Sequence, residues 1–168
     1  LISHEGRNNF IKNLAISLEG NTLLLFQYVD KHGRILYNII KDIAGDRSVF
    51  FVHGGVSGEE RNEIRRIVEE QNDAIIIASY GTFSTGVNIR NLHSVIFASP
   101  SKSKIRNLQS IGRALRKSST KDKAVLYDIA DDLTWKKNLN FTMRHLMERV
   151  KIYDEEEFEY KFYKVGIE

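Results

Sequence analysis

Five short apolar runs divide this sequence, and they restrict its possible folds more than any other feature. Each run has five to eight residues and is almost continuously apolar, which is typical of strands buried on both faces of a parallel sheet. Strands that alternate with helices form parallel sheets covered on both sides, so the sequence predicts an α/β fold with three αβα layers. The runs are residues 22–29 (TLLLFQYV), 48–52 (SVFFV), 74–78 (AIIIA), 94–98 (SVIFA) and 124–129 (AVLYDI).

The segments between these runs have apolar residues at helical spacing. One of them opens with Ser57-Gly58-Glu59-Glu60, a capping box in which Ser57 accepts a hydrogen bond from a backbone amide of the first turn and Glu60 reaches back. The other predicted elements are a helix over residues 7–18, a helix from an Asp30 N-cap to Ile43, a loop over residues 79–91, a helix over residues 139–150, and an edge strand or small extension over residues 158–165.

Polar segments follow three of the predicted strands. They are His53-Gly54-Gly55, residues 79–91, and the loop that leads into a helix after Pro100. Ligands of open parallel sheets bind at the carboxyl ends of the strands, and glycine lets a backbone approach a ligand closely. We therefore expect the three segments to share one edge of the sheet and to form the functional site there.

The helix predicted after Pro100 carries a cationic stripe. At about 100° per residue, Gln109, Arg113 and Arg116 fall within an arc of about 60°, and apolar residues fill the neighbouring arc. Gly112 lies at the border and costs a helix about 1 kcal/mol relative to Ala, so a close approach to the helix is expected there. Two guanidinium groups one turn apart suit a phosphate.

A bland alternative for this stripe is a solvated basic face or a flexible basic loop without a partner. Residues 102–123 contain eight Lys or Arg residues and one acid, so this stretch carries +7 while the rest of the chain sums to −4. A local basic block of this kind favours a phosphate or polyanion site. Charge alone does not decide between the two interpretations.

Composition excludes several other classes of function. The chain has no cysteine, which rules out disulfides and zinc–thiolate sites, and its five histidines lack metal-ligand spacing, so no metal site is predicted. No apolar run reaches the roughly 18 residues of a membrane helix, and the first residues lack the apolar centre of a signal peptide. A cytoplasmic location without membrane contact is expected.

The order and spacing of several sequence motifs narrow the possible functions further. Residues 109–116 (QSIGRALR) resemble motif six of superfamily two helicases and translocases. The strand at residues 23–26, the segment Phe51-Val52-His53-Gly54-Gly55 and residues 79–88 (SYGTFSTGVN) resemble motifs four, four-a and five, in the same order. Over residues 22–130 the chain therefore resembles the second RecA-like lobe of such a motor, with the P-loop NTPase type of three-layer sheet.

The resemblance implies roles for the residues at the nucleotide. Arg113 and Arg116 would face the γ-phosphate of ATP, with Arg116 the preferred arginine finger, and Gln109 would orient that phosphate or the attacking water. Gly86 and Asn88 would lie near the ribose and link it to the nucleic-acid site.

The resemblance also implies a second group of contacts. His53, Gly54, Ser79 and Thr82 would touch phosphates of a nucleic acid through hydroxyl, imidazole and backbone amide groups, which position a strand without reading its sequence. His53 is as compatible with a structural loop histidine as with a phosphate ligand. Trp135 and Phe141 could stack on bases, but a place in the core or an interface is more usual for such residues.

Two departures from the family pattern concern the nucleic acid. Motif five usually has an acid where this chain has Asn88, and its loop is one residue longer than in DEAD-box proteins. Both features are closer to double-strand translocases of the Swi/Snf kind. Gln109 replaces the histidine of DEAD-box enzymes, which favours DNA over RNA as the partner. The resemblance implies duplex or branched DNA, with RNA–DNA hybrids as a further substrate.

The chain lacks the other half of an ATPase site. It contains neither a G-x-x-x-x-G-K-[ST] phosphate loop nor a magnesium-binding Asp-Glu pair after an apolar strand. ATP and Mg²⁺ would be bound mainly by an N-terminal RecA-like lobe of the same polypeptide, and the isolated chain is expected to be inactive. The expected division is a connecting helix at residues 1–20, the lobe at 21–135, and a C-terminal helix with a small extension at 136–168.

Two other hypotheses stay open at this point. The chain could be a stand-alone nucleic-acid-binding module, which predicts salt-sensitive DNA binding without coupling to ATP. It could also be an unrelated α/β enzyme for a phosphorylated metabolite, which predicts a small-molecule pocket and no DNA binding. The spacing of Gln109, Arg113 and Arg116, together with Gly86 and Asn88, argues against the metabolite enzyme.

Overall fold

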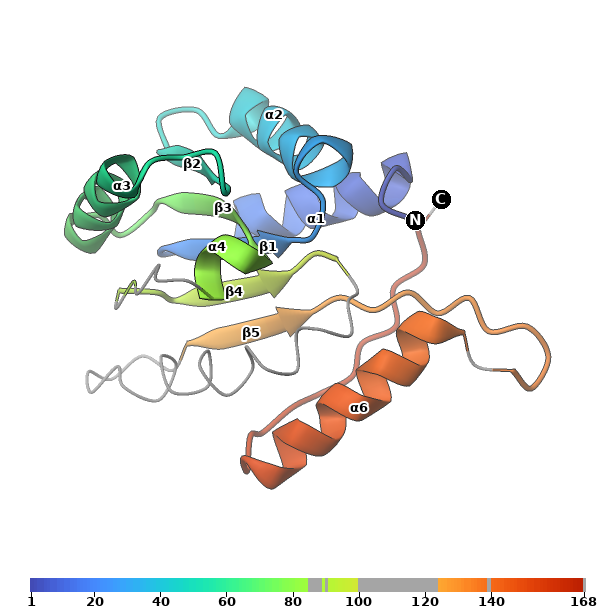
Figure 1. Ribbon diagram of the computed structural model, residues 1–168. Coiled ribbons are helices and arrows are strands. Elements are labelled where there is room, and N and C mark those ends of the chain that lie inside the picture. Colours follow the sequence, from blue (N-terminus) through green and yellow to red (C-terminus); the bar gives the residue numbers. More distant parts are fainter. Residues whose placement is uncertain (85–88, 90, 100–123, 139, 168) are drawn as a thin grey trace.

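The computed structural model describes residues 1–84, 89, 91–99, 124–138 and 140–167. Five strands form one sheet in the order β2-β3-β1-β4-β5, and every neighbouring pair is parallel. This confirms the predicted parallel α/β sheet (Figure 1). The strands are β1 (Thr22–Phe26), β2 (Val49–Val52), β3 (Ile75–Ser79), β4 (Ser94–Phe97) and β5 (Val125–Asp128).

Helices cover both faces of the sheet, as the apolar strands require. Side chains of a strand alternate between the faces, so Leu23 and Leu25 belong to one buried cluster and Leu24 and Phe26 to the other. The first cluster includes side chains of α3 and α6, and the second includes side chains of α1 and α2. The helices are α1 (Glu5–Ser17), α2 (Arg34–Ile43), α3 (Gly58–Glu70), α4 (Tyr80–Ser84) and α6 (Phe141–Glu155).

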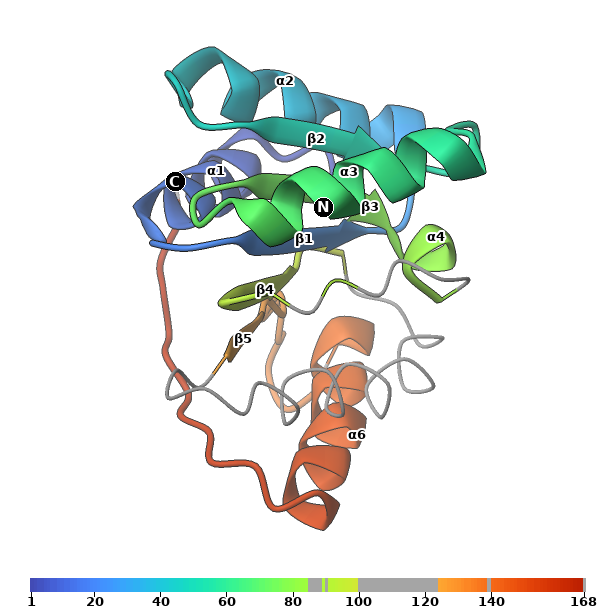
Figure 2. The ribbon, with the colours of Figure 1, turned by 90° about the vertical axis from the view of Figure 1, so that its left-hand side faces the viewer.

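The order of the strands separates the helices along the sheet. Helices α2 and α3 lie at the β2 side of the molecule, whereas α6 lies beyond β4 and β5 (Figure 2). Strands β2 and β3 lie on one side of β1, and after β3 the chain passes β1 to form β4 on its other side. Strand order thus changes direction beside β1, which is the place where open parallel sheets bind ligands.

Two local predictions were wrong. Asp30 is not the N-cap of α2, because a π-helical turn (Val29–Gly33) precedes that helix and the Asp30 carboxylate bonds to Arg34 instead. The turn buries His32 completely and brings Gly33 against Phe26, where a Cβ atom would lie 2.4 Å from the ring.

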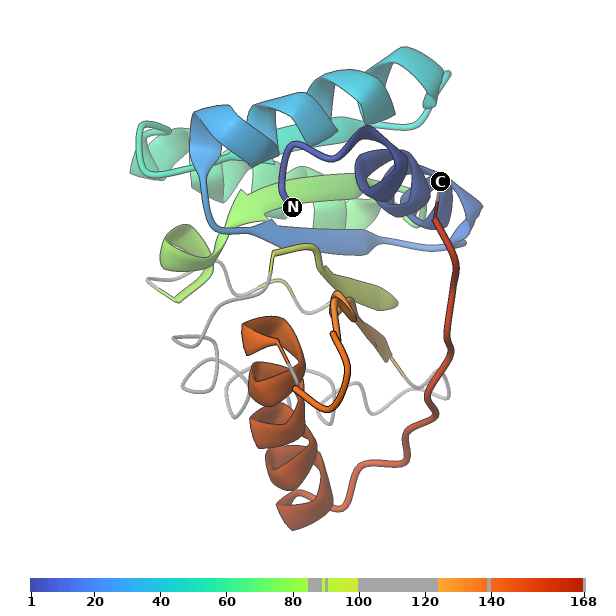
Figure 3. The same cartoon turned by 90° about the vertical axis from the view of Figure 1, so that its right-hand side faces the viewer.

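The predicted loop after β3 begins with the short helix α4. Residues 158–167 form no strand, which leaves the small extension of the two alternatives predicted for this segment. The C-terminal segment runs from the end of α6 back towards α1 (Figure 3). Trp135 and Phe141 are not in the core, since 75% and 74% of their surfaces are exposed. The sequence identified apolar residues correctly but could not show which ones lack a partner.

Candidate functional site

The carboxyl ends of all five strands meet at one edge of the sheet, hereafter the carboxyl edge. Because the strands are parallel, His53 after β2, Tyr80 after β3, Ser99 after β4 and Ile129 after β5 all follow strand ends on this edge. Of the predicted site residues, the structure describes His53, Gly54, Ser79 and Thr82. Gln109, Arg113, Arg116, Gly86 and Asn88 lie outside the described residues, so their roles stay predictions.

His53 is held by the turn that follows β2. Its Nδ1 accepts a hydrogen bond from the Gly55 backbone amide at 3.1 Å, so Nε2 is the ring nitrogen left to act as a donor. The ring packs 5.0 Å from the centroid of Phe51. A Cβ atom at Gly55 would lie 2.9 Å from the imidazole, whereas one at Gly54 would meet nothing within 4 Å. Gly55 therefore shapes the turn, and Gly54 presents its backbone to open space.

Ser79 and Thr82 form a hydroxyl pair at the end of β3. Their Oγ atoms lie 2.7 Å apart, and Ser79 Oγ also accepts the Thr82 backbone amide at 3.3 Å. Ser79 is half-buried and Thr82 is buried. This pair fixes the first turn of α4. It leaves the exposed Gly81 as the most accessible backbone of that turn.

Tyr80 connects the segment after β3 to the end of β4. Its buried hydroxyl donates to the Ser99 carbonyl at 3.2 Å, and its ring packs edge-on against Phe97 at 5.9 Å. Burial raises the pKa of the Tyr80 phenol well above its ordinary value. The connection matters because Ser99 is the last described residue before the predicted arginine helix.

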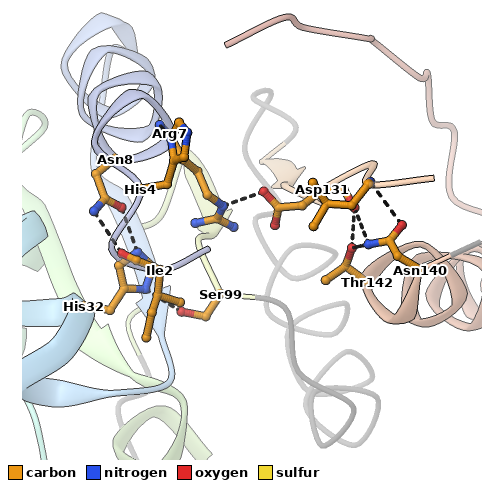
Figure 4. A network of polar contacts seen from close by, with 10 residues as sticks. Ile2, His4, Arg7, Asn8, His32, Ser99, Asp131, Asn140 and Thr142 are labelled. Atoms are coloured by element: carbon orange, nitrogen blue, oxygen red, sulfur yellow. Dashed lines mark hydrogen bonds and ion pairs between the residues drawn. The ribbon is translucent and has the colours of Figure 1, made fainter. Parts of the chain in front are cut away.

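A buried polar network extends this connection to the N-terminal helix (Figure 4). The His32 ring lies 2.7 Å from Ser99 Oγ through Nδ1 and 3.1 Å from Asn8 Oδ1 through Nε2. Ser99 Oγ also accepts the Gln27 backbone amide, and the Asn8 amide donates to the Ile2 carbonyl. The network joins α1, the turn after β1 and the end of β4 in one rigid unit.

A buried ion pair ties α1 to the segment after β5 in the same region (Figure 4). Arg7 Nε lies 2.7 Å from Asp131 Oδ1, and both side chains are almost fully buried. Among the residues that the structure describes, the Arg7 Nη1 and Nη2 atoms and Asp131 Oδ2 have no hydrogen-bond partner. Breaking such a pair on one side leaves an uncompensated buried charge. The pair therefore fixes where the chain leaves β5.

A second buried ion pair holds α6 against the last strand. Arg149 binds both carboxylate oxygens of Asp128, at 2.6 and 2.9 Å, and the Tyr153 hydroxyl donates to Asp128 Oδ2 at 2.6 Å. Burial, together with the Asp128 charge, raises the pKa of Tyr153 above its ordinary value. Arg149 and Tyr153 thus supply the hydrogen bonds of the Asp128 carboxylate, which would otherwise be an unpaired charge at the end of β5.

These ion pairs bear on how a nucleotide and its metal ion would be held. Within the described ranges, no group of three or more His, Asp or Glu side chains could hold a metal ion. The two carboxylates nearest the end of β5, Asp128 and Asp131, are already occupied by Arg149 and Arg7. The described residues therefore do not fit a magnesium site, and none of their carboxylates is assigned to one.

Comparison with known proteins identifies the family of the domain that carries this edge. The family of helicase conserved C-terminal domains matches residues 6–118, a range that contains all three polar segments predicted from the sequence. This chain belongs to the helicase C-terminal domain family. Within the described ranges, no helix has both the length and the apolar character needed to cross a membrane.

The ATP-dependent DNA helicase UvsW of Enterobacteria phage T4 is a relative of this chain. The two are 37% identical over 174 aligned positions, which cover 96% of this chain and 34% of UvsW. The crystal structure of T4 UvsW matches with a TM-score of 0.76 over 94% of this chain and 34% of UvsW. The chain thus spans about a third of the length of this relative.

More distant structures share the fold. The C-terminal domain of the DEAD-box protein Dbp5 matches with a TM-score of 0.65 at 15% identity, over 91% of this chain and 81% of Dbp5. The C-terminal part of the Fun30 ATPase domain matches with a TM-score of 0.61 at 19% identity, over 93% of this chain and 55% of that structure. These likenesses confirm the RecA-like three-layer fold of a helicase C-terminal domain.

Sequence reasoning missed the buried polar residues behind the site. His32 and Asn8 sit in helical patterns that favour surface positions, and Arg149 was counted only as part of an amphipathic helix. The available signal was the single charged residue at a position of α6 that otherwise repeats apolar side chains, between Leu146 and Tyr153. Its partner Asp128 lies 21 residues away, and sequence periodicity carries no information on such a pairing.

Proposed function

We propose that this chain is the C-terminal motor lobe of an ATP-dependent DNA helicase or translocase that acts in recombination, replication or repair. The observation that supports the proposal most strongly is the 37% identity to a DNA helicase across 96% of the chain. The whole protein would unwind DNA or move branch points, and the RNA–DNA hybrid is a further candidate substrate. It would act in the cytoplasm, that of the host cell if a phage encodes it.

In this proposal the lobe supplies half of a composite site. Arg116 and Arg113 stabilise charge on the γ-phosphate of ATP, and Gln109 orients it. Arginine fingers contribute factors of about 10³–10⁵ in related phosphoryl transfer, but only on a nucleotide held by other groups. ATP and Mg²⁺ are bound mainly by an N-terminal RecA-like lobe of the parent polypeptide, while Gly86 and Asn88 contact the ribose.

The nucleic-acid contacts lie on the same edge. The open backbone at Gly54, the Nε2 of His53 and the region of Ser79 and Thr82 receive DNA phosphates. The described geometry supports this assignment for the His53 turn, where Gly54 has free space around it. At the end of β3 the two hydroxyls bond to each other, so Ser79 would have to exchange that bond for one to a phosphate.

DNA-stimulated ATPase activity of the full-length parent, wild type against Arg116→Ala, tests the proposal. We expect the rate to fall by about 10³-fold or more while DNA binding and folding persist. The same assay on the isolated 168-residue chain is expected to show no DNA-stimulated hydrolysis. An unchanged rate for Arg116→Ala would contradict the motor assignment and favour a DNA-binding module without ATPase coupling.

A further inference from the structure

The turn between β5 and α6 combines an exposed tryptophan with a cluster of cations. We define the Trp135 turn as residues 133–138. Trp135 is 75% exposed and Leu133 is 58% exposed, and Lys136 and Lys137 at the corner of the turn are exposed as well. Phe141, at the start of α6, is 74% exposed. Core packing therefore does not explain these apolar side chains.

The Trp135 turn is built to hold its shape. The Asn138 backbone amide donates to the Trp135 carbonyl at 3.1 Å, and Lys136 adopts a φ of 56°, so the chain reverses tightly. Asn140 accepts the Leu133 backbone amide at 3.2 Å and donates to the Asp131 carbonyl at 2.8 Å. The backbone of such a turn is already ordered and loses little conformational entropy when a ligand binds.

The base of the Trp135 turn is anchored in the protein interior (Figure 4). The Asp131 carbonyl also accepts the Thr142 hydroxyl, and the Asp131 carboxylate is paired with the buried Arg7. The anchor therefore reaches α1 on one side and α6 on the other. The turn is thereby coupled to α1, the helix that the family resemblance implies as the connection between the two lobes.

Charge around the Trp135 turn is one-sided. Residues 133–147 contain Lys136, Lys137 and Arg144 and no acid, and no described residue forms an ion pair with these three side chains. The preceding acid, Asp132, accepts hydrogen bonds from Thr134. The far end of α6 is acidic instead, with residues 154–157 reading DEEE. An anionic ligand is thus attracted to the start of α6 and repelled from its end.

The position of the Trp135 turn agrees with a polymeric ligand. The turn extends past the carboxyl ends of β4 and β5 (Figure 1), on the edge that also carries His53 and Ser79. An exposed indole stacks on a base only where the base is unpaired at that face, and such stacking tolerates any sequence. Lysines beside it neutralise the backbone phosphates.

We propose that the Trp135 turn is a binding site for single-stranded DNA, in which Trp135 stacks on an unpaired base and Lys136, Lys137 and Arg144 contact phosphates. The inference rests on the proposed DNA-dependent function of this lobe and extends it. It assigns a contact for the unpaired strand at a junction to residues outside the helicase motifs. A docking surface for another protein lobe is the competing occupant.

Trp135 is the single tryptophan of the chain, so its fluorescence reports on this turn alone. We would titrate the 168-residue chain at low salt with oligothymidine carrying a dye, and follow indole fluorescence and dye anisotropy separately. Stacking predicts that indole fluorescence is quenched in parallel with the anisotropy change. A blunt duplex is expected to quench much less.

Paired variants separate this site from other basic surfaces. Lys136→Ala/Lys137→Ala should weaken oligothymidine binding by about tenfold and lower the salt slope by about 1.4, since each phosphate contact to a single strand contributes about 0.7. Trp135→Ala should weaken binding by about fivefold or more, and Trp135→Phe should restore most of it. The matched control Lys41→Ala/Lys151→Ala removes two exposed lysines, one in the last turn of α2 and one towards the acidic end of α6, and should change binding little.

Two results of the oligothymidine titration would overturn the inference. One is DNA binding by anisotropy with unquenched Trp135 and unaffected lysine variants, which would leave the proposed motor function intact. The other is no binding of oligothymidine by this chain at low salt. The ATPase comparison of the parent with Arg116→Ala tests the motor function independently of either result. Loss of parent stability in Trp135→Ala with normal DNA binding would identify a protein-docking surface instead.

Discussion

The two edges of the sheet use their polar residues in opposite ways. At the amino edge, the two N–H donors of the fully buried Asn21 side chain are shared among the carbonyls of Val68, Gln71 and Asn91, and its Oδ1 accepts the Ala74 amide. Arg47 adds hydrogen bonds to the carbonyls of Asp73, Ile16 and Gly20. Here side chains form hydrogen bonds with the backbone groups of the loops that precede the strands.

At the carboxyl edge, by contrast, several polar and apolar groups face outward. Gly54 has open space around its backbone, and Trp135 is largely exposed. Only the layer beneath is closed, by the pairs Arg7–Asp131 and Arg149–Asp128. The comparison teaches that the two edges of a parallel sheet can serve different purposes. Side chains at the amino edge satisfy backbone groups and stabilise the fold. At the carboxyl edge the two buried ion pairs form a rigid polar floor, and the groups above it stay accessible to a ligand.

Asn21→Ala should have the largest effect on folding. The Val68 and Gln71 carbonyls keep other hydrogen bonds, but the Ala74 amide and the Asn91 carbonyl rely on this side chain. Each buried group left without a partner costs about 1–3 kcal/mol, so we expect the free energy of unfolding to fall by about 3 kcal/mol. Urea denaturation of the chain measures it. Asn13→Ala, at an exposed position of α1, is the matched control and should cost almost nothing. Equal losses for the two variants would refute the closed amino edge.

Alkaline pH should loosen the floor of the carboxyl edge. The pKa values of Tyr153 and Tyr80 are raised in the folded state, so both contribute stability below the ordinary tyrosine value of about 10. Above that pH the unfolded chain releases protons that the folded chain retains, and stability should fall by up to about 1.4 kcal/mol per pH unit for each tyrosine.

Denaturation at several pH values compares Tyr153→Phe with Tyr163→Phe to test this dependence. Tyr153→Phe should make the alkaline decline shallower, because one of the two buried phenols no longer titrates. The control Tyr163→Phe changes a side chain that is 82% exposed and should leave the slope unchanged. If Tyr153→Phe left the pH dependence of stability unchanged, the Tyr153 phenol would not be the group whose raised pKa stabilises the carboxyl edge.

Ser57→Ala should lower the free energy of unfolding by a smaller amount. It also tests whether this residue serves the fold alone or also the DNA site. Ser57 Oγ accepts the Glu60 amide at 3.2 Å as the N-cap of α3, and loss of such a cap costs about 1 kcal/mol. Ser57 follows the His53 turn closely, yet we expect DNA affinity to be unchanged. Ser57→Asp keeps an acceptor and should retain stability. A large loss of DNA affinity in Ser57→Ala would place the cap within the site.

Much of this organisation could be predicted from the sequence, because apolar runs and capping residues act locally. The strands, the Ser57 cap and the order of the polar segments are examples. Asp30 was misassigned because a π-helical turn depends on the burial of His32 against residues far along the chain. For Trp135 the sequence left the core and an interface open, because hydrophobicity does not reveal whether a partner surface exists within the chain.

The measurement that tests the account most directly compares a variant of the proposed arginine finger with a variant of the amino edge in the full-length parent. Thermal unfolding and DNA-stimulated ATPase activity would be recorded for Arg116→Lys and Asn21→Ala. We predict that Arg116→Lys unfolds like the wild type but loses hydrolysis, while Asn21→Ala unfolds at lower temperature and keeps its activity per folded molecule. Normal hydrolysis by a folded Arg116→Lys protein would contradict the assignment of this lobe as half of a motor.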